Sequence, residues 1–126
     1  PFDCNKTAYK EKFLNFKNFN LKDNAVVLIC GGYPSSIFIP FQNPKAKFIY
    51  LYGESGNYNF RYPKNVEDEI KEIINKPGNE IFLLYSDVEY APIDWEYISK
   101  FIDRNKFSCT PADNLYGKNH MFCKKK

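Results

Sequence analysis

The stretch from Cys30 to Ser36, CGGYPSS, has the residue types of a reactive or anion-binding loop. Its first residue, Cys30, ends the apolar run 25–30, and Pro34 is a residue that commonly begins a helix. Helix N-termini offer free N–H groups to anions, and a cysteine there can have a lowered pKa. The candidate ligand contacts in this loop are Gly31, Gly32, Ser35 and Ser36.

The same loop lacks what the known motifs of this kind require. It has neither the third glycine of a dinucleotide-binding turn nor the Lys-Ser/Thr ending of a phosphate-binding loop. A cysteine phosphatase needs an arginine six residues after the cysteine, and Ser36 stands there. Pro40 also ends any helix here after barely two turns. The pattern therefore favours a structural turn, with Cys30 as a small buried apolar residue.

Two further groups of residues could contact a ligand. Asp87 and Glu89 follow the apolar run 80–86, and open α/β sheets bind ligands at the carboxyl ends of such strands. The loop 53–64 is rich in tyrosine, and Tyr58 and Arg61 could stack on or hold sugar rings. The alternatives are an exposed loop at 87–89 and aromatic rings that simply cover the sheet.

The sequence points to no catalytic residues, no metal site and no cofactor. Its four cysteines include no Cys-x-x-Cys pair, and His120 is the single histidine, so zinc-ligand spacing is absent. Neither Asp87 nor Glu89 has an identifiable basic or nucleophilic partner. The residue types therefore favour ligand binding over catalysis by this domain alone.

These residues must be positioned by alternating helices and strands. We predict helices over 7–19, 34–40, 65–76 and 92–104, strands over 46–52 and 80–86 besides 25–30, and a closing hairpin over 107–126. Asn65 is the expected cap of its helix, with Asp68 as reciprocal partner. The order predicts an α/β fold: a three-layer, Rossmann-like sheet of about five strands, mostly parallel, with an antiparallel C-terminal hairpin.

One domain is expected over 1–126. It comprises an N-terminal amphipathic helix and linker (1–20), a βαβαβα core (21–106), and a hairpin with a basic tail (107–126). Within the hairpin, Cys109 and Cys123 lie symmetrically about Tyr116, so they would face each other across two strands. A disulfide there is geometrically reasonable and would imply an oxidising compartment, whereas the alternative is two reduced thiols.

Composition argues against nucleic acid as a partner and against a membrane span within this segment. The formal net charge of +3 is too small for a nucleic-acid footprint. The mean hydropathy is −0.54, and no apolar run is long enough to span a membrane. Because the chain begins with Pro1 and not methionine, we expect it to be part of a longer protein.

Three stretches carry a resemblance to a known family. They are VVLICGGYPSSIFIPFQNPKAKFIYLYG (26–53), EIFLLYS (80–86) and CTPADNLYGKNHMFCKKK (109–126). Together they resemble the C-terminal extracytoplasmic domain of bacterial polytopic inner-membrane proteins, whose membrane part is similar to polyprenyl-linked glycosyltransferases. The match covers most of residues 21–126. Cys4 and Cys30 are additional to that pattern, which leaves their pairing open.

The resemblance implies a soluble periplasmic domain tethered to a transmembrane region upstream of Pro1. It would be non-catalytic and would bind or position a glycan, a lipid-linked substrate or a partner at the membrane surface. The resemblance also favours the Cys109–Cys123 bridge. The alternative, from the residues alone, is a small cytosolic enzyme or a nucleotide- or phosphate-binding module that uses the loop Cys30-Gly31-Gly32.

Overall fold

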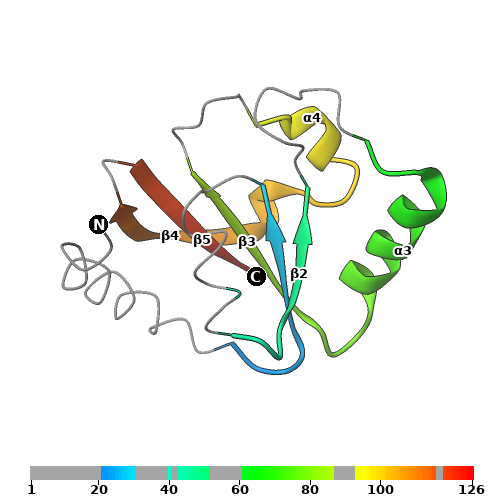
Figure 1. Cartoon of the computed structure of the whole chain (residues 1–126), viewed down its shortest axis with the longest axis horizontal. Coiled ribbons are helices and arrows are strands. Elements are labelled where there is room, and N and C mark those ends of the chain that lie inside the picture. The colour runs from blue at the N-terminus through cyan, green and yellow to red at the C-terminus, as the bar shows by residue number, and fades with distance from the viewer. Residues whose placement is uncertain (1–20, 31–39, 41–42, 52–60, 87–92, 116–117) are drawn as a thin grey trace, which may run out of the picture.

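The sheet has five strands in the order β2-β1-β3-β5-β4 (Figure 1). The computed structural model describes residues 21–30, 40, 43–51, 61–86, 93–115 and 118–126. The strands are β1 (Ala25–Ile29), β2 (Lys47–Tyr50), β3 (Glu80–Ser86), β4 (Phe107–Leu115) and β5 (Lys118–Lys125). β1 pairs in parallel with β2 and with β3, whereas β5 is antiparallel to β3 and β4. The predicted α/β fold with five strands and an antiparallel hairpin is confirmed.

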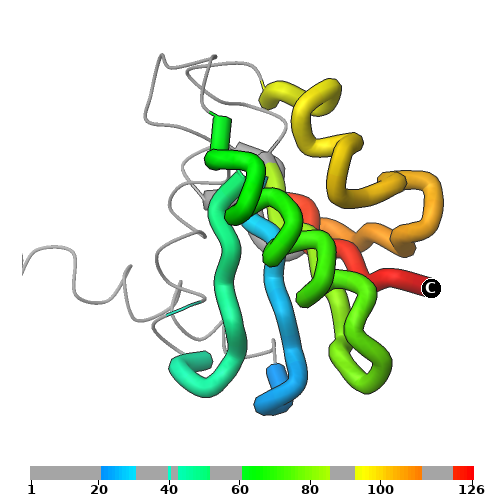
Figure 2. Tube along the Cα trace, turned by 90° about the vertical axis from the view of Figure 1, so that its right-hand side faces the viewer, coloured from blue at the N-terminus to red at the C-terminus, as the bar shows by residue number. Residues whose placement is uncertain are grey.

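β1 lies inside the sheet and is buried on both faces, as its unbroken apolar sequence predicts. Val26 and Leu28 face a core that also contains side chains of the helices, whereas Val27 and Ile29 face the other side. The buried residues of this second side are Ala25, Val27, Ile29, Phe82, Leu84 and Phe122. Figure 2 shows α4 and the segment after it to the right of strands β1 and β2.

α3 (Lys64–Asn75) packs Ile70 and Ile74 on the first face of the sheet. The predicted Asn65 cap is wrong, because the helix begins at Lys64 and the N-cap position is taken by Pro63, two residues earlier, with no side-chain cap. Pro63 itself is not helical, because its ψ of 153° is extended, as is usual for the residue that precedes a helix. Asp68 forms an ion pair with Lys64 instead of closing a capping box.

α4 (Trp95–Ile98) is much shorter than the helix predicted over 92–104. Asp94 caps it by accepting the N–H of Tyr97 at 3.0 Å. The chain then turns, and Asp103 has an extended backbone (φ −108°, ψ 110°) before a 3₁₀ turn at Arg104–Lys106. The Asp103 carboxylate accepts the N–H of Asn105, a local bond that favours a turn over helix continuation.

The hairpin of β4 and β5 carries the predicted disulfide. Cys109 and Cys123 are directly opposite in the ladder, with Cα atoms 4.0 Å apart, and their sulfur atoms are bonded. Cys123 is fully buried in the helix-side core, so the bridge joins the edge strand β4 to that core. Cys30 is buried, as predicted, and its pairing, which the sequence left open, is now settled: it is a free cysteine. Cys4 lies outside the described residues.

The predicted helix over 7–19, residues 34–39 of the predicted helix over 34–40, and the 1–20 part of the domain division fall outside the described residues. None of the described helices combines the length and the apolar character that crossing a bilayer requires.

Candidate functional site

The strand order creates a topological switch point between β1 and β3. From β1 the chain crosses to β2 on one side and later to β3 on the other. In open α/β sheets, ligands bind outside the carboxyl ends of the two strands where the order reverses. β1 ends at Ile29 and β3 at Ser86, and the N–H of Cys30 donates to the carbonyl of Leu84 at 2.9 Å. The carboxyl ends of β1 and β3 are therefore the place where a ligand site is expected.

Most of the ligand contacts predicted from the sequence come after β1 or β3 in the chain, outside the residues that the structure describes. Gly31, Gly32, Ser35, Ser36, Tyr58, Asp87 and Glu89 all lie outside the described residues. Arg61 is described, and it precedes α3. One of its guanidinium nitrogens, Nη2, lies 3.0 Å from Oδ2 of Asp94, and its Cζ lies 4.4 Å from the ring centroid of Tyr97. Arg61 thus holds α4 against the segment before α3.

Tyr97, in α4, is the centre of a buried polar network between α4, α3 and the segment before α3. Its side chain is only 2% exposed, and its hydroxyl donates to Oε2 of Glu67 at 2.7 Å. The same hydroxyl accepts the N–H of Tyr62 at 2.9 Å, and Lys100 lies 4.0 Å from that Glu67 oxygen. Burial and, next, the bond to Glu67 raise the pKa of Tyr97. Tyr97 therefore keeps its proton at neutral pH and acts as a structural link, not as a base.

An open hollow lies beside α4. This hollow, which we call the Trp95 hollow, has a volume of about 420 Å³ and is lined by Trp95, Ile98, Ser99, Ile102, Asp103, Arg104 and Asn105. The Arg104 guanidinium lies 3.9 Å from the ring centroid of Trp95. The Trp95 ring makes an edge contact with Tyr85, at 5.1 Å between centroids. Tyr85 is the next-to-last residue of β3, so the Trp95 hollow lies beside the carboxyl end of that strand.

Sequence reasoning missed Trp95 and Arg104 as site residues. A helix through 92–104 would separate them by about 13 Å along its axis, since each residue advances 1.5 Å. In the structure the turn after α4 brings Arg104 back over the indole ring. The turn-forming run Asp103-Arg104-Asn105 was the available signal, because aspartate and asparagine favour turns over helix interiors.

Cys30 lacks the environment of a nucleophile. It is fully buried, and burial raises the pKa of its thiol far above the usual value, with only partial opposition from the charge of Arg104. The thiolate is the reactive form of cysteine, and a raised pKa keeps the thiol protonated. This argues against nucleophilic catalysis by the loop Cys30-Gly31-Gly32.

The buried thiol predicts a pH dependence of stability. The folded state holds the Cys30 proton more tightly than the unfolded chain does. The contribution of this proton to the free energy of unfolding is therefore fully present below about pH 8.5 and is lost as pH rises. We expect the free energy of unfolding to fall by roughly 1.4 kcal/mol per pH unit above that value. Urea unfolding of the wild type and Cys30→Ala between pH 8 and 10 measures it. Equal slopes in the two proteins would contradict the assignment.

Among the residues that the structure describes, no group of three or more His, Cys, Asp or Glu side chains could hold a metal ion. Comparisons with protein-family models, with curated proteins and with solved structures find no match to this chain.

Proposed function

We propose that this chain is a non-catalytic domain that binds or positions a glycan or the sugar of a lipid-linked substrate. The proposed site is the Trp95 hollow, beside the carboxyl end of β3. The loops after β1 and β3, with Gly31, Gly32, Ser35, Ser36, Asp87 and Glu89, are proposed to extend it. In this proposal the domain lies on the periplasmic face of the inner membrane, as part of a membrane protein whose transmembrane region precedes Pro1.

The observation that carries the proposal is the composition of the Trp95 hollow. Its volume of about 420 Å³ falls in the range of small-molecule sites. Trp95 offers an aromatic surface of the kind on which the apolar face of a sugar ring packs. Around it, Ser99, Asp103, Arg104 and Asn105 supply hydroxyl, carboxylate, guanidinium and amide groups. Such a set matches the many donors and acceptors of a polyhydroxylated ligand.

Binding is favoured over catalysis because the charged groups near the hollow are already engaged. Asp103 accepts the N–H of Asn105, and Asp94 both caps α4 and pairs with Arg61. Glu67 is 8% exposed and accepts the Tyr97 hydroxyl. A general acid or base would have to give up one of these partners to react. Each of them is better suited to fixing the shape of the site.

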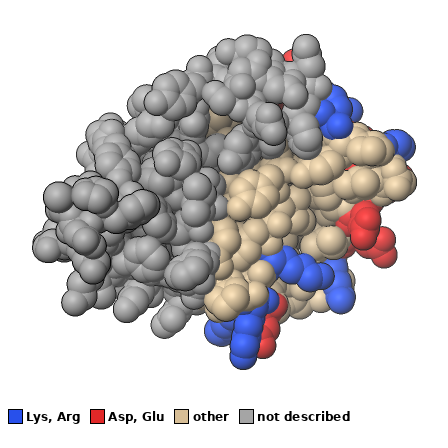
Figure 3. All heavy atoms as spheres, in the orientation of Figure 1, with Lys and Arg blue, Asp and Glu red and all other residues tan. Residues whose placement is uncertain are grey.

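The disulfide supports the extracytoplasmic setting. Disulfides persist in oxidising compartments such as the bacterial periplasm and are rare in the cytosol. On the face shown in Figure 3, basic and acidic side chains of the described residues are interspersed, and they do not form the continuous basic surface that nucleic-acid binding requires. We also propose the full three-layer arrangement, because the second face of the sheet is buried as well.

A fluorescence titration tests the proposal directly, because Trp95 is the sole tryptophan of the chain. We expect a saturable change in emission on addition of at least one neutral saccharide from a panel of glucose, galactose, mannose, N-acetylglucosamine and maltose. Arg104→Met should weaken that binding at least fivefold, because it removes the guanidinium beside the ring and keeps most of the side-chain bulk.

Lys124→Met is the matched control, because the Lys124 ammonium also lies over an aromatic ring, that of Phe82, but does not line the Trp95 hollow. It should leave saccharide affinity within twofold of the wild type. No saturable change with any saccharide, or an equal loss in the two variants, would contradict the Trp95 hollow as the site.

A further inference from the structure

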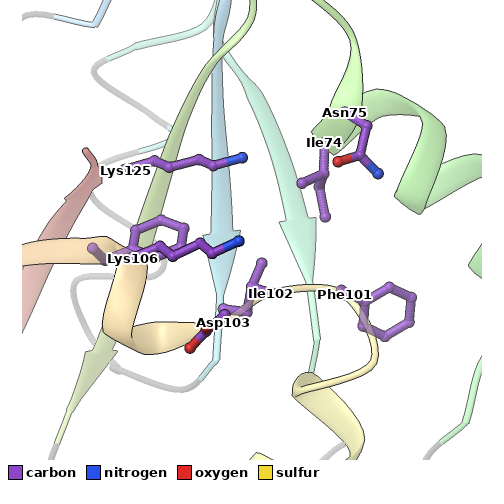
Figure 4. Close-up of a pocket in the computed structure, with 8 residues that line it drawn as sticks. Ile74, Asn75, Phe101, Ile102, Asp103, Lys106 and Lys125 are labelled. Atoms are coloured by element: carbon purple, nitrogen blue, oxygen red, sulfur yellow. The ribbon is translucent and has the colours of Figure 1, made fainter.

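Two lysines extend into a second, smaller hollow at the base of the hairpin. This lysine hollow has a volume of about 120 Å³ and is lined by Ile74, Asn75, Phe101, Ile102, Asp103, Lys106, Phe107 and Lys125. Figure 4 shows Lys106 and Lys125 lying side by side and pointing the same way, toward Ile74 and Asn75. Two ammonium groups therefore flank one concave surface.

The backbone fixes this arrangement. Lys125 is the ladder partner of Phe107, the residue after Lys106, and the N–H of Lys126 donates to the carbonyl of Lys106 at 2.9 Å. Like charges held close together repel unless an anion lies between them. Within the described part of the chain, neither Lys106 nor Lys125 forms a salt bridge. Asp103 also lines the hollow, but among the described residues no carboxylate forms a salt bridge with either lysine.

The lysine hollow adjoins the Trp95 hollow. Ile102 and Asp103, in the segment after α4, line both hollows. Asp103 contributes the carboxylate of the shared wall, and Oδ1 of that carboxylate accepts the N–H of Asn105 at 3.0 Å. A ligand with a sugar ring in the Trp95 hollow could therefore direct a substituent past Asp103 toward the two lysines.

We propose that the lysine hollow binds a phosphate group, and that the ligand of this domain is a phosphorylated sugar. The sugar part rests on the proposed function, whereas the phosphate part rests on Lys106 and Lys125 alone. Ammonium groups bind phosphate oxygens as point charges with three donors each, and two of them balance a phosphomonoester dianion. The site is open to solvent, so the interaction weakens as salt is added.

A purely structural role is the competing explanation. The last turn of α3 contains no basic residue, and Ile74 and Asn75 of that turn line the lysine hollow. Lys106 and Lys125 could then serve only to offset the partial negative charge of the helix C-terminus. That role would affect stability and leave ligand binding unchanged.

The test is a titration of the ¹⁵N-labelled chain, followed by NMR, with three kinds of probe. These are inorganic phosphate, the neutral sugars glucose and N-acetylglucosamine, and the 1-phosphates of the same two sugars. We expect a sugar 1-phosphate to bind about ten times more tightly than its neutral sugar, with amide shifts around residues 102–107 and 124–126. The double variant Lys106→Gln/Lys125→Gln should abolish that difference and leave binding of the neutral sugar unchanged.

The control is Lys45→Gln/Lys47→Gln, which removes the same charge from two exposed lysines that do not line the hollow. It should preserve the tenfold preference. Equal affinity for a sugar and its phosphate, an equal loss in the control, or a lower Tm of Lys106→Gln/Lys125→Gln as the only effect would overturn the proposal. Lysine-dependent binding of inorganic phosphate, with no sugar bound, would refute the proposed function and retain the phosphate site.

Discussion

Replacing both Cys109 and Cys123 by alanine is expected to lower the free energy of unfolding by about 3 kcal/mol. The two residues are 14 apart in sequence, and closing a loop of that size removes about this much conformational entropy from the unfolded chain. The bridge also ties the edge strand β4 to the buried side of β5, since Cys123 is fully buried. Urea unfolding at pH 7 measures the loss.

Reduction of the wild type provides the control for this prediction. The reduced wild type should unfold at nearly the same urea concentration as the double alanine variant, and a reductant should not shift the variant further. A stability loss below about 1 kcal/mol would mean that the hairpin is held by its ladder and side-chain packing alone, contrary to this account.

Tyr97→Ala is expected to destabilise the protein by about 4 kcal/mol, and Tyr97→Phe by about 2 kcal/mol. The alanine variant leaves a cavity where the ring packs edge-on against Phe101, at 5.4 Å between centroids. Both variants leave buried Glu67 and the N–H of Tyr62 without the hydroxyl that satisfies them. An unsatisfied buried polar group costs about 1–3 kcal/mol.

Tyr85→Phe is the matched control for the hydroxyl. Tyr85 is half-buried against Trp95, and the structure gives its hydroxyl no hydrogen bond to another described residue. Its loss should change the free energy of unfolding by less than about 0.5 kcal/mol. If Tyr97→Phe were equally mild, the network around Glu67 would not be holding α4 in place. Thermal and urea unfolding of the three variants decide the matter.

The sequence was most informative where an element is defined by its own residues. The unbroken apolar run 25–30 predicted a strand buried on both faces, because only such a strand has apolar side chains pointing both ways. Ile70 and Ile74 recur at helical spacing, and they face the sheet. The symmetry of Cys109 and Cys123 about Tyr116 predicted facing positions in a hairpin. The pairs next to the turn are offset from that symmetry by one residue, and the register shift between Pro111 and Asp113 brings the two cysteines opposite each other.

Sequence reasoning failed where local signals competed. The segment 92–104 has helical periodicity over Tyr97, Ile98, Phe101 and Ile102, and all four are buried. The turn that follows Ile98 buries the same residues, so periodicity cannot distinguish it from a continuous helix. The N-terminus of α3 was similarly ambiguous, because Pro63 and Asn65 are both good starting residues.

The sequence by itself determined the class of fold, the central strand, the α3 core face and the disulfide, because each depends on spacing within one segment or one hairpin. Tertiary structure alone decided that Arg104 lies over Trp95, that Tyr97 joins Glu67 to Tyr62, and that Lys106 and Lys125 share a hollow. Each of these contacts joins residues that are far apart in sequence or would lie far apart along one continuous helix over 92–104. Their proximity follows from the turn after α4 and from the register of the closing hairpin.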